Sequence, residues 1–483
     1  MTSYLSLLAP AAPEIVLLAL VSIVLVADLF IDDSRRMTTY FLSQLTLLIT
    51  LLVLVAAPHG GPVYTFHNMY VDDTLGRALK GLVLVAVSLV FAYSKTYAEQ
   101  RDMLKGELFT LMLFSTLGMM VLISANHFLT LYLGLELLAL CQYALVAMQR
   151  DSARASEAAM KYFVLGALAS GLLLYGMSMI YGATGGQLGL QAVAQALAAP
   201  GVDHGLAAVG TVFIVAGLAF KLGVVPFHMW IPDVYEGAPT VMTLFVGTAP
   251  KIAGVAFFVR MLGEGLAPLS HDWQQMLVIM AVLSMALGNI TAIAQTNIKR
   301  MLAYSTISHM GFVLLGILAA SQQGYAAATY YSVAYTLMGL AAFGMILLLS
   351  RAGFEAENLD DFKGLNRRSP WFAFVMLLVM ISMAGIPPSV GFFAKLSVLR
   401  AALDAGFTWL VVVAVLLSLV GAFYYLRVIK LMYMDEPVDQ APIEGDLDLR
   451  VLLSLNGLAV LLFGVLPQPL LALFDHAIVQ SLR

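Results

Sequence analysis

A series of long apolar runs, separated by short polar connections, fills nearly all of the 483 residues of this chain. Each run has the ~20 residues that an α-helix needs to cross about 30 Å of hydrocarbon. Because a bilayer offers no water to backbone N–H and C=O groups, only helices and closed barrels can span it. The runs show no strand-like alternation, so the sequence predicts an all-α membrane protein with about 14 transmembrane helices.

Composition agrees with this class and argues against several others. The chain is 61% hydrophobic and 11% charged, whereas soluble domains carry about 25% charged residues. Its net charge of −4 favours no strongly charged partner such as nucleic acid. A single cysteine, Cys141, cannot form a disulfide framework or an iron–sulfur site. No pair of histidines or carboxylates has metal-ligand spacing on one helix face, so we expect no metal.

The runs and their connections also predict a topology. Lysines and arginines gather in the connections after odd-numbered spans, which predicts that these connections face the cytoplasm and that both termini lie outside. The connection at 182–205 is rich in Gly and Ala, so we expect a surface loop there. The predicted spans are 14–30, 37–57, 75–94, 108–123, 128–148, 157–181, 206–231, 241–262, 273–295, 300–320, 325–350, 371–399, 407–434 and 449–473.

The seventh span contains an unusual stretch, FKLGVVPFHMWIPDVYEGAP, from Phe220 to Pro239. Lys221 lies within the hydrophobic register. Pro226 follows five residues later, and its ring lacks an N–H and clashes with the carbonyl of Leu222. A lysine in a bilayer costs a few kcal/mol or more, and free carbonyls persist there only beside protein or water. Together these features predict a broken helix at a site that handles a proton or an ion.

The twelfth span, SMAGIPPSVGFFAKLSVL, repeats this combination. Gly385 and Pro388 have the same spacing as Gly223 and Pro226, and Lys395 follows. The breaks lie five spans apart, so the two halves would be inverted relative to each other, as in inverted-repeat transporters. The predicted divisions are helices 1–3 within 1–107, a first five-helix repeat at 108–262, a second at 273–434 and a last helix at 449–475.

Five lysines lie within the predicted spans: Lys80, Lys161, Lys221, Lys251 and Lys395. Lys80 is close to the end of its span and can extend to the interface. Lys161, one turn into the sixth span, can do the same or take part in a relay. The other three lie too deep for that. A buried ammonium releases its proton more readily than a solvated one, which suits proton transfer.

Glu136 lies in the middle of the fifth span and is the natural partner of Lys221. The two would form either the gate of a relay or a fixed structural ion pair. His228, just after the first break, has a side chain suited to proton transfer near neutral pH, or it could bond to the freed carbonyls. His309 lies mid-span in a stripe of hydroxyl residues, which would line a wet path or join helices.

In chain order, Glu136, Lys221, Lys251 and Lys395 would form a sideways relay between two offset half-channels, with Lys395 toward the outer side. There is no P-loop, and the glycines of the connection at 182–205 follow no strand. We therefore expect no NADH, flavin or ATP site on this chain, and the energy for transport would come from another subunit.

Several stretches together resemble the antiporter-like membrane subunits of the proton-pumping NADH-quinone oxidoreductase, respiratory complex I. That family is related to Mrp-type sodium/proton antiporters and membrane-bound hydrogenases. Within it the chain is similar to the N-type branch, because M-type subunits typically have glutamate where Lys395 stands and L-type subunits add a long lateral helix. The stretches are LELLALCQYAL around Glu136, FKLGVVPFHMWIPDVYEGAPT from Phe220, TAPKIAG around Lys251, NIKRMLAYSTISHMG from Asn297 and GIPPSVGFFAKL around Lys395.

The resemblance implies roles for individual residues. Glu136 and Lys221 would be the paired residues of helices 5 and 7, and Lys251 the relay lysine of helix 8. Lys395 would be the terminal residue on helix 12, and Lys161 falls where the family often has a lysine in helix 6. Inverted repeats of helices 4–8 and 9–13 would surround these residues.

The resemblance also implies a proton-translocating subunit in a bacterial inner membrane, driven by quinone reduction elsewhere. FMN, iron–sulfur clusters and quinone would be held by other subunits, with no cofactor on this chain. Its partners would be a neighbouring antiporter-like subunit, small membrane subunits and the lipid bilayer. Two alternatives stay open, namely a subunit of an Mrp-type sodium/proton antiporter and a non-pumping structural subunit.

Overall fold

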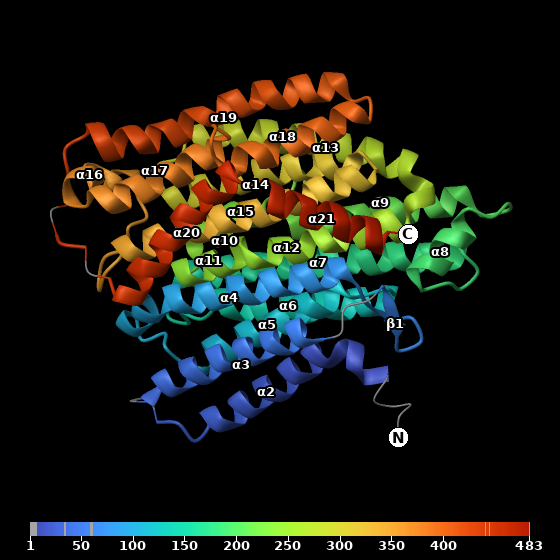
Figure 1. Cartoon of the computed structure of the whole chain (residues 1–483), viewed down its shortest axis with the longest axis horizontal. Helices are drawn as coiled ribbons and strands as arrows, with labels where there is room; N and C mark the ends of the chain where they lie inside the picture. Colours follow the sequence, from blue (N-terminus) through green and yellow to red (C-terminus); the bar gives the residue numbers. More distant parts are fainter. Residues whose placement is uncertain (1–6, 33–34, 58–60, 440, 444, 483) are drawn as a thin grey trace.

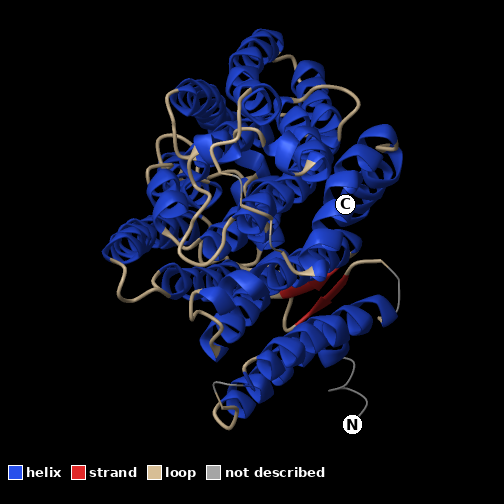
Figure 2. Cartoon of the chain, turned by 90° about the vertical axis from the view of Figure 1, so that its left-hand side faces the viewer, coloured by secondary structure: helices blue, strands red, loops and turns tan. Residues whose placement is uncertain are grey.

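Long helices that run side by side make up almost all of the computed structural model, which describes residues 7–32, 35–57, 61–439, 441–443 and 445–482 (Figure 1). Among these residues, 13 helices are long and apolar enough to cross a membrane, and Pro370–Ala384 is a shorter apolar helix. The two strands of one short hairpin are the only named strands there (Figure 2). The prediction of an all-α membrane protein is confirmed.

The helices follow the predicted spans in order. In the first half they are α2 (Ala12–Asp28), α3 (Met37–Ala56), α4 (Thr74–Gln100), α5 (Gly106–Ile123), α6 (Phe128–Val146), α7 (Ala153–Ala183), α9 (His204–Leu222), α10 (Trp230–Gly237), α11 (Thr240–Gly247) and α12 (Ala249–Phe258). In the second half they are α13 (Ser270–Ile293), α14 (Ile298–Leu318), α15 (Gln322–Leu349), α17 (Pro370–Ala384), α18 (Val390–Asp404), α19 (Thr408–Met434) and α20 (Leu447–Val465).

Burial divides the bundle into a core and a perimeter. In α14 and α15, 94% of the most apolar window is buried, against 28% in α19 and 33% in α2. The perimeter helices expose large apolar side chains, including Phe41, Phe163 and Phe423. Exposed faces of this kind suit contact with lipid or with another membrane subunit. The core helices α14 and α15 are therefore where buried polar groups can be shielded from lipid.

Both predicted helix breaks are present. Helix α9 ends at Leu222, directly before Gly223, whose φ of 85° is left-handed, and α10 begins at Trp230. Helix α17 ends at Ala384, directly before Gly385 with φ of 84°, and α18 begins at Val390. Glycine is favoured at both positions because a side chain would be strained at this φ. Each break therefore exposes the carbonyl end of one half-helix inside the bundle.

The eighth span differs from its prediction as one continuous helix at 241–262. Helix α11 ends at Gly247, and α12 begins at Ala249 with Pro250 in its first turn. Proline has no N–H to continue the ladder, so it is tolerated only where a new helix starts. After α12 the chain widens into a π-helical segment, η3 (Val259–Gly265). Pro250 is the local sign of this third break, but the uniformly apolar run around it predicts a single helix.

Two other predictions need correction. The connection at 182–205 is more than a surface loop, because it contains α8 (Leu190–Leu197), whose buried side chains pack against η3. The last span, predicted at 449–473 within a division at 449–475, is two helices. The first is α20, and the second is α21 (Gln468–Ser481), which starts after Pro467 and packs on α4 and α15.

One end of the bundle gathers the hairpin and the two ends of the described chain (Figure 1). The strands β1 (Val63–Thr65) and β2 (Tyr70–Asp72) pair antiparallel in the connection before α4. Thr65 donates to the carbonyl of Leu7 at 2.6 Å, and Thr74 donates to Gln480 at 2.5 Å. The two ends of the described chain thus lie at the same end of the bundle (Figure 1).

Helices α5 and α6 approach each other backbone to backbone. A Cβ atom on Gly134 would lie 2.7 Å from the amide nitrogen of Leu122, and one on Gly118 would lie 2.5 Å from that of Leu138. Small residues permit this close approach, which is how many membrane helices associate. The contact fixes the position of α6, which carries Glu136.

We predict that Gly134→Val lowers the melting temperature of the purified chain in detergent. The added methyl groups must push α6 away from α5, and overpacking of this kind costs about 1–3 kcal/mol. The matched control is Gly171→Val, because a Cβ at Gly171 on α7 meets no atom within 4 Å. Equal melting temperatures for the two variants would contradict the close α5–α6 contact.

Candidate functional site

Two buried lysines bond to the backbone carbonyls that the helix breaks expose. Lys251 Nζ donates to the carbonyl of Leu222 at 2.9 Å, and Lys395 Nζ donates to the carbonyl of Ala384 at 2.8 Å. Each acceptor is the last residue of its half-helix, directly before the left-handed glycine. Both lysines are almost fully buried. The same contact therefore occurs at both breaks.

This contact satisfies two groups that would each be costly alone in hydrocarbon. The C-terminal end of a helix carries a partial negative charge and unpaired carbonyls, and an ammonium is the complementary group. The lysines reach the two ends by different routes, because Lys251 comes from α12 whereas Lys395 comes from α18, just beyond its own break. Lys395 also donates to Ser418 on α19 at 3.0 Å. The tryptophan of α10, Trp230, covers another carbonyl of the first break, that of Phe220, at 3.0 Å.

Lys221 and Glu136 are neighbours without direct contact. Lys221 lies in the last turn of α9, with Nζ 3.5 Å from the hydroxyl of Tyr143. Glu136 on α6 is the acidic group that acts electrostatically on it, yet no ion pair within 4.0 Å joins these two described residues. One Glu136 carboxylate oxygen is buried and has no hydrogen-bond partner in the described part of the chain. Glu136 and Lys221 are thus near each other but form no ion pair in this structure, an arrangement called open below.

A small cavity connects Lys221 with Lys251. Both lysines line it, together with Gln142 on α6 and Trp230 on α10. Its volume is about 20 Å³, and a cavity of that size accommodates about one water molecule. The amide and the two lysine nitrogens supply the polar partners that a water needs. A single bridging molecule could therefore link the two amines.

His309 lies on α14 among tyrosines. Its Nδ1 is 2.7 Å from the hydroxyl of Tyr331, and its Nε2 is 3.0 Å from that of Tyr425. Lys395 is near enough to influence the imidazole electrostatically. Lys251 does not touch this group among the described contacts. Helix α15 lies between them, and its Thr336 donates to the carbonyl of Thr248 at 3.3 Å.

His228 and Lys161 lie apart from the buried lysines. His228 is half-buried in the segment between α9 and α10, where the neighbouring Met229 is 61% exposed. Lys161 on α7 has a side chain that is 44% exposed, and it pairs with Asp233 and Glu157, each at 2.8 Å. Lys161 thus lies in an exposed polar network rather than in the interior. The side chains of this network line a hollow of about 180 Å³. That network includes Arg154, Glu157, Lys161, Asp233, Glu236 and Arg300.

A second buried lysine group escaped the sequence analysis. Lys80, expected to extend to an interface, is completely buried. Its Nζ lies 2.6 Å from Glu14 on α2 and 2.8 Å from the hydroxyl of Tyr70, which in turn donates to Glu14 at 2.8 Å. The sequence predicts Glu14 only as the start of the first span. Its 66-residue separation from Lys80 gave no signal that the two would meet.

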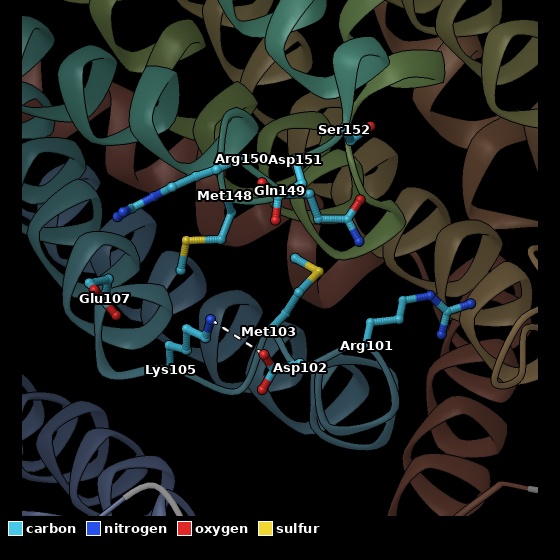
Figure 3. Close-up of a pocket in the computed structure, with 10 residues that line it drawn as sticks. All are labelled: Arg101, Asp102, Met103, Lys105, Glu107, Met148, Gln149, Arg150, Asp151 and Ser152. Carbon is cyan, nitrogen blue, oxygen red and sulfur yellow. Dashed lines mark ion pairs between the residues drawn. The ribbon is translucent and has the colours of Figure 1, made fainter.

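Wider hollows lie at the ends of the helices, away from the lysines at the breaks. Figure 3 shows one of about 480 Å³ between the connection that precedes α5 and the connection that precedes α7. Lys105 and Asp102 form an ion pair of 3.5 Å at its rim. Its side chains are charged or flexible, and none of the predicted site residues is among them. The lining residues are Arg101, Asp102, Met103, Lys105, Glu107, Met148, Gln149, Arg150, Asp151 and Ser152.

One connection at the helix ends is held by charge. Arg351 pairs with Asp439 at 2.7 Å. The hydrogen bond from Arg351 holds the pKa of the Asp439 carboxyl below its usual range, and the positive charge of Arg368 contributes further. No group of three or more His, Cys, Asp or Glu side chains that could hold a metal ion occurs within the described ranges.

Comparison with known proteins places this arrangement in a family. The family model described as "NADH:quinone oxidoreductase/Mrp antiporter, TM" matches residues 125–421. The chain is 62% identical over 474 residues to the NADH-quinone oxidoreductase subunit N of Thiobacillus denitrificans, which covers 98% of each chain. It is also 58% identical over 473 residues to the subunit of the same name from Nitrosomonas europaea, again over 98% of each.

Solved structures show the same fold. A chain of respiratory complex I from Thermus thermophilus with bound aureothin superposes with a TM-score of 0.82 at 29% identity, covering 95% of this chain and 98% of that one.

We predict that Lys80→Met destabilises the chain, because it leaves the Glu14 carboxylate buried without its cation. Removal of one partner of a buried ion pair costs about 3–5 kcal/mol. The double variant Lys80→Met/Glu14→Gln should recover part of that loss, since the remaining charge is gone. The melting temperature in detergent provides the measurement, with Lys105→Met in an exposed pair as control. Equal melting temperatures for Lys80→Met and Lys105→Met would count against the triad.

Proposed function

The chain belongs to the NADH-quinone oxidoreductase subunit N family, and from that premise we propose that Glu136, Lys221, Lys251 and Lys395 carry protons through it. It is an integral membrane subunit of that oxidoreductase and translocates protons. The observation that most supports this proposal is the pair of ammonium–carbonyl contacts that Lys251 and Lys395 make at the breaks. Two lysines held by uncharged partners deep in the bundle are groups whose charge can change.

The first half of the relay depends on the open Glu136–Lys221 pair. When the carboxylate approaches, it stabilises the charged ammonium, and when it withdraws, the ammonium loses that support. The proton then passes through the cavity of about 20 Å³ to Lys251. Lys221 and Lys251 line the same small cavity, so positive charges on both would repel each other. The two lysines are therefore charged in turn rather than together.

The second half carries the proton from Lys251 to Lys395. We place His309 between them, since its two nitrogens bond to tyrosine hydroxyls and Lys395 acts on it electrostatically. Lys395 holds the proton at the second break and releases it toward the outer side. His228 and Lys161, which lie outside this line, have secondary roles at most.

Other parts of the complex supply the energy. We propose that FMN, iron–sulfur clusters and quinone are held by other subunits, and that quinone reduction there moves the charge at the Glu136 end. The partners on the membrane side are a neighbouring antiporter-like subunit and small membrane subunits. The exposed apolar faces of α2, α7 and α19 are available for such contacts and for lipid.

We further propose the finer topology. The excess of lysine and arginine after odd-numbered spans favours a bacterial inner membrane with both termini in the periplasm. The divisions at 108–262 and 273–434 would be inverted repeats, each with a broken helix. The matching glycine conformations and lysine contacts at the two breaks support this division.

The alternatives from the sequence have less support. A subunit of an Mrp-type sodium/proton antiporter would share this fold, since an Mrp complex from Dietzia sp. DQ12-45-1b superposes with a TM-score of 0.82 at 22% identity over 98% of this chain and 97% of that one. A likeness at that identity concerns the fold alone, whereas 62% identity links the chain to the subunit N family. A structural subunit without pumping would need no lysine at either break.

We predict that Lys221→Met and Glu136→Gln each reduce the rate of proton pumping by about tenfold, equivalent to ~1.4 kcal/mol at the transfer step. Both changes keep the side-chain volume but remove the charge. The measurement is pH-gradient formation by the assembled complex in liposomes, with the amount of complex determined on a native gel. Normal pumping in both variants would refute their roles.

We predict that Lys161→Met has a smaller effect than Lys221→Met in the same assay. Lys161 is paired at the exposed surface, and exposed pairs contribute about 0–1 kcal/mol. A loss equal to that of Lys221→Met would place Lys161 in the relay and contradict its assignment to the surface network.

Replacing sodium by potassium in the buffer should leave pumping unchanged, whereas a sodium/proton antiporter would respond.

A further inference from the structure

Another buried lysine, Lys299, lies at the start of α14 and has no part in the relay described so far. Its side chain is only 3% exposed. Nζ donates to the carbonyl of Ala238 at 2.8 Å and lies 4.0 Å from Glu357. The predicted spans 273–295 and 300–320 leave this lysine in the connection between them. Like the lysines at the breaks, it bonds to the carbonyl at the C-terminal end of a half-helix, here α10.

Two glutamates separate Lys299 from the solvent. Glu357 has a side chain that is 21% exposed, and it bonds to Arg154 at 2.9 Å. Glu355 accepts from Tyr97 at 2.9 Å and pairs with Arg101 at 2.8 Å. The backbone of this segment is fixed over the lysine, because the amide of Ile298 donates to the carbonyl of Glu357 at 2.7 Å.

The charged groups around Lys299 come from every neighbouring element. They are Glu355 and Glu357 on the segment after α15, Arg154 on α7 and Glu236 on α10. A carboxylate in contact with water can collect a proton and pass it to an amine. Lys299 is therefore positioned to be the first buried group that accepts a proton from the carboxylates of Glu355 and Glu357.

A line of buried hydroxyls begins at Tyr235 on α10. This residue lies one helical turn, about 5 Å along the axis, before Ala238, whose carbonyl accepts from Lys299. The hydroxyl of Tyr235 is buried and has no hydrogen-bond partner among the described residues. It faces the side chain of Thr306. The hydroxyl of Thr306 lies 2.6 Å from that of Tyr335 on α15.

The line ends at His309. The rings of Tyr335 and His309 have centroids 5.3 Å apart, and Nδ1 of His309 bonds to Tyr331 at 2.7 Å. Lys299, Thr306 and His309 are spaced by seven and three residues on α14, which brings them to one face of that helix. Three elements, α10, α14 and α15, thus contribute to one polar column inside the most buried part of the bundle.

We propose that this column is a proton-uptake route, from Glu357 through Lys299, Tyr235, Thr306 and Tyr335 to His309. It rests on the proposed function, because it delivers protons to the second half of the same relay. Glu357 gives its proton to the Lys299 amine. Each hydroxyl then accepts one proton and releases another, so the hydroxyls end as they began, and His309 takes up the proton. No oxidation or reduction is involved.

Three variants of the assembled complex test the route in liposomes. Lys299→Arg keeps the positive charge and donor groups, but a guanidinium cannot release its proton in a protein. Thr306→Val and Tyr335→Phe remove one hydroxyl each and keep the shape. We expect each variant to lower the rate of proton pumping by at least about tenfold, since a lost proton-transfer group typically costs about 10²–10⁴-fold in rate.

Matched controls separate transfer from packing. Tyr330→Phe removes another buried hydroxyl from α15 that has no described partner and lies outside the column. Lys363→Arg repeats the lysine change in an ion pair at the surface. Both should pump like the unmodified complex. If Lys299→Arg fails to assemble, the two hydroxyl variants decide the question by themselves.

The outcomes distinguish this route from the proposed function. Normal pumping in Thr306→Val and Tyr335→Phe would overturn the route, whatever Lys299→Arg does. If Lys221→Met still abolishes pumping in that case, the proposed function stands without this route. Normal pumping in Lys221→Met as well would overturn both. A loss in Tyr330→Phe equal to that in Tyr335→Phe would also overturn the route, because packing would then explain the effect.

Discussion

The bond between a lysine ammonium and the carbonyl at a broken helix end is the interaction on which this structure depends. An unpaired carbonyl and an unpaired ammonium are each costly in hydrocarbon. Lys251 on Leu222 and Lys395 on Ala384 remove both costs at once. The carbonyls at the breaks therefore depend on the lysines for donors, and the lysines depend on these carbonyls for acceptors. This mutual requirement couples the charge of the side chain to the backbone geometry, since a lysine that loses its proton keeps fewer donors for the carbonyl.

The breaks were predictable from the sequence because their causes are local. A proline removes a donor and a glycine permits the left-handed turn, and both residues are visible in the chain. The apolar runs likewise fixed the order of the helices. The split between α11 and α12 has a local cause too, in Pro250, but it was overlooked because the surrounding run is uniformly apolar.

Contacts between distant segments could not be read in the same way. Lys80 meets Glu14, and Lys299 lies beneath Glu357, only because the bundle packs those helices together. The four residues proposed for the relay lie buried or half-buried in the bundle, yet nothing in the spacing showed that Lys251 and Lys395 would end on equivalent carbonyls. The exposure of Lys161 was equally hidden, since it depends on how α7 lies against α10.

The partner of each lysine decides what that lysine can do. Lys80 is enclosed with a carboxylate and a tyrosine, so loss of its proton would leave Glu14 charged and alone in the interior. Lys251 and Lys395 have only neutral oxygens as partners, and losing a proton there strands no counter-charge. A close ion pair in the interior, such as the 2.6 Å contact of Lys80 with Glu14, thus holds a proton in place. A carbonyl, or a carboxylate as far away as Glu357 is from Lys299, leaves the proton free to move in the proposed relay.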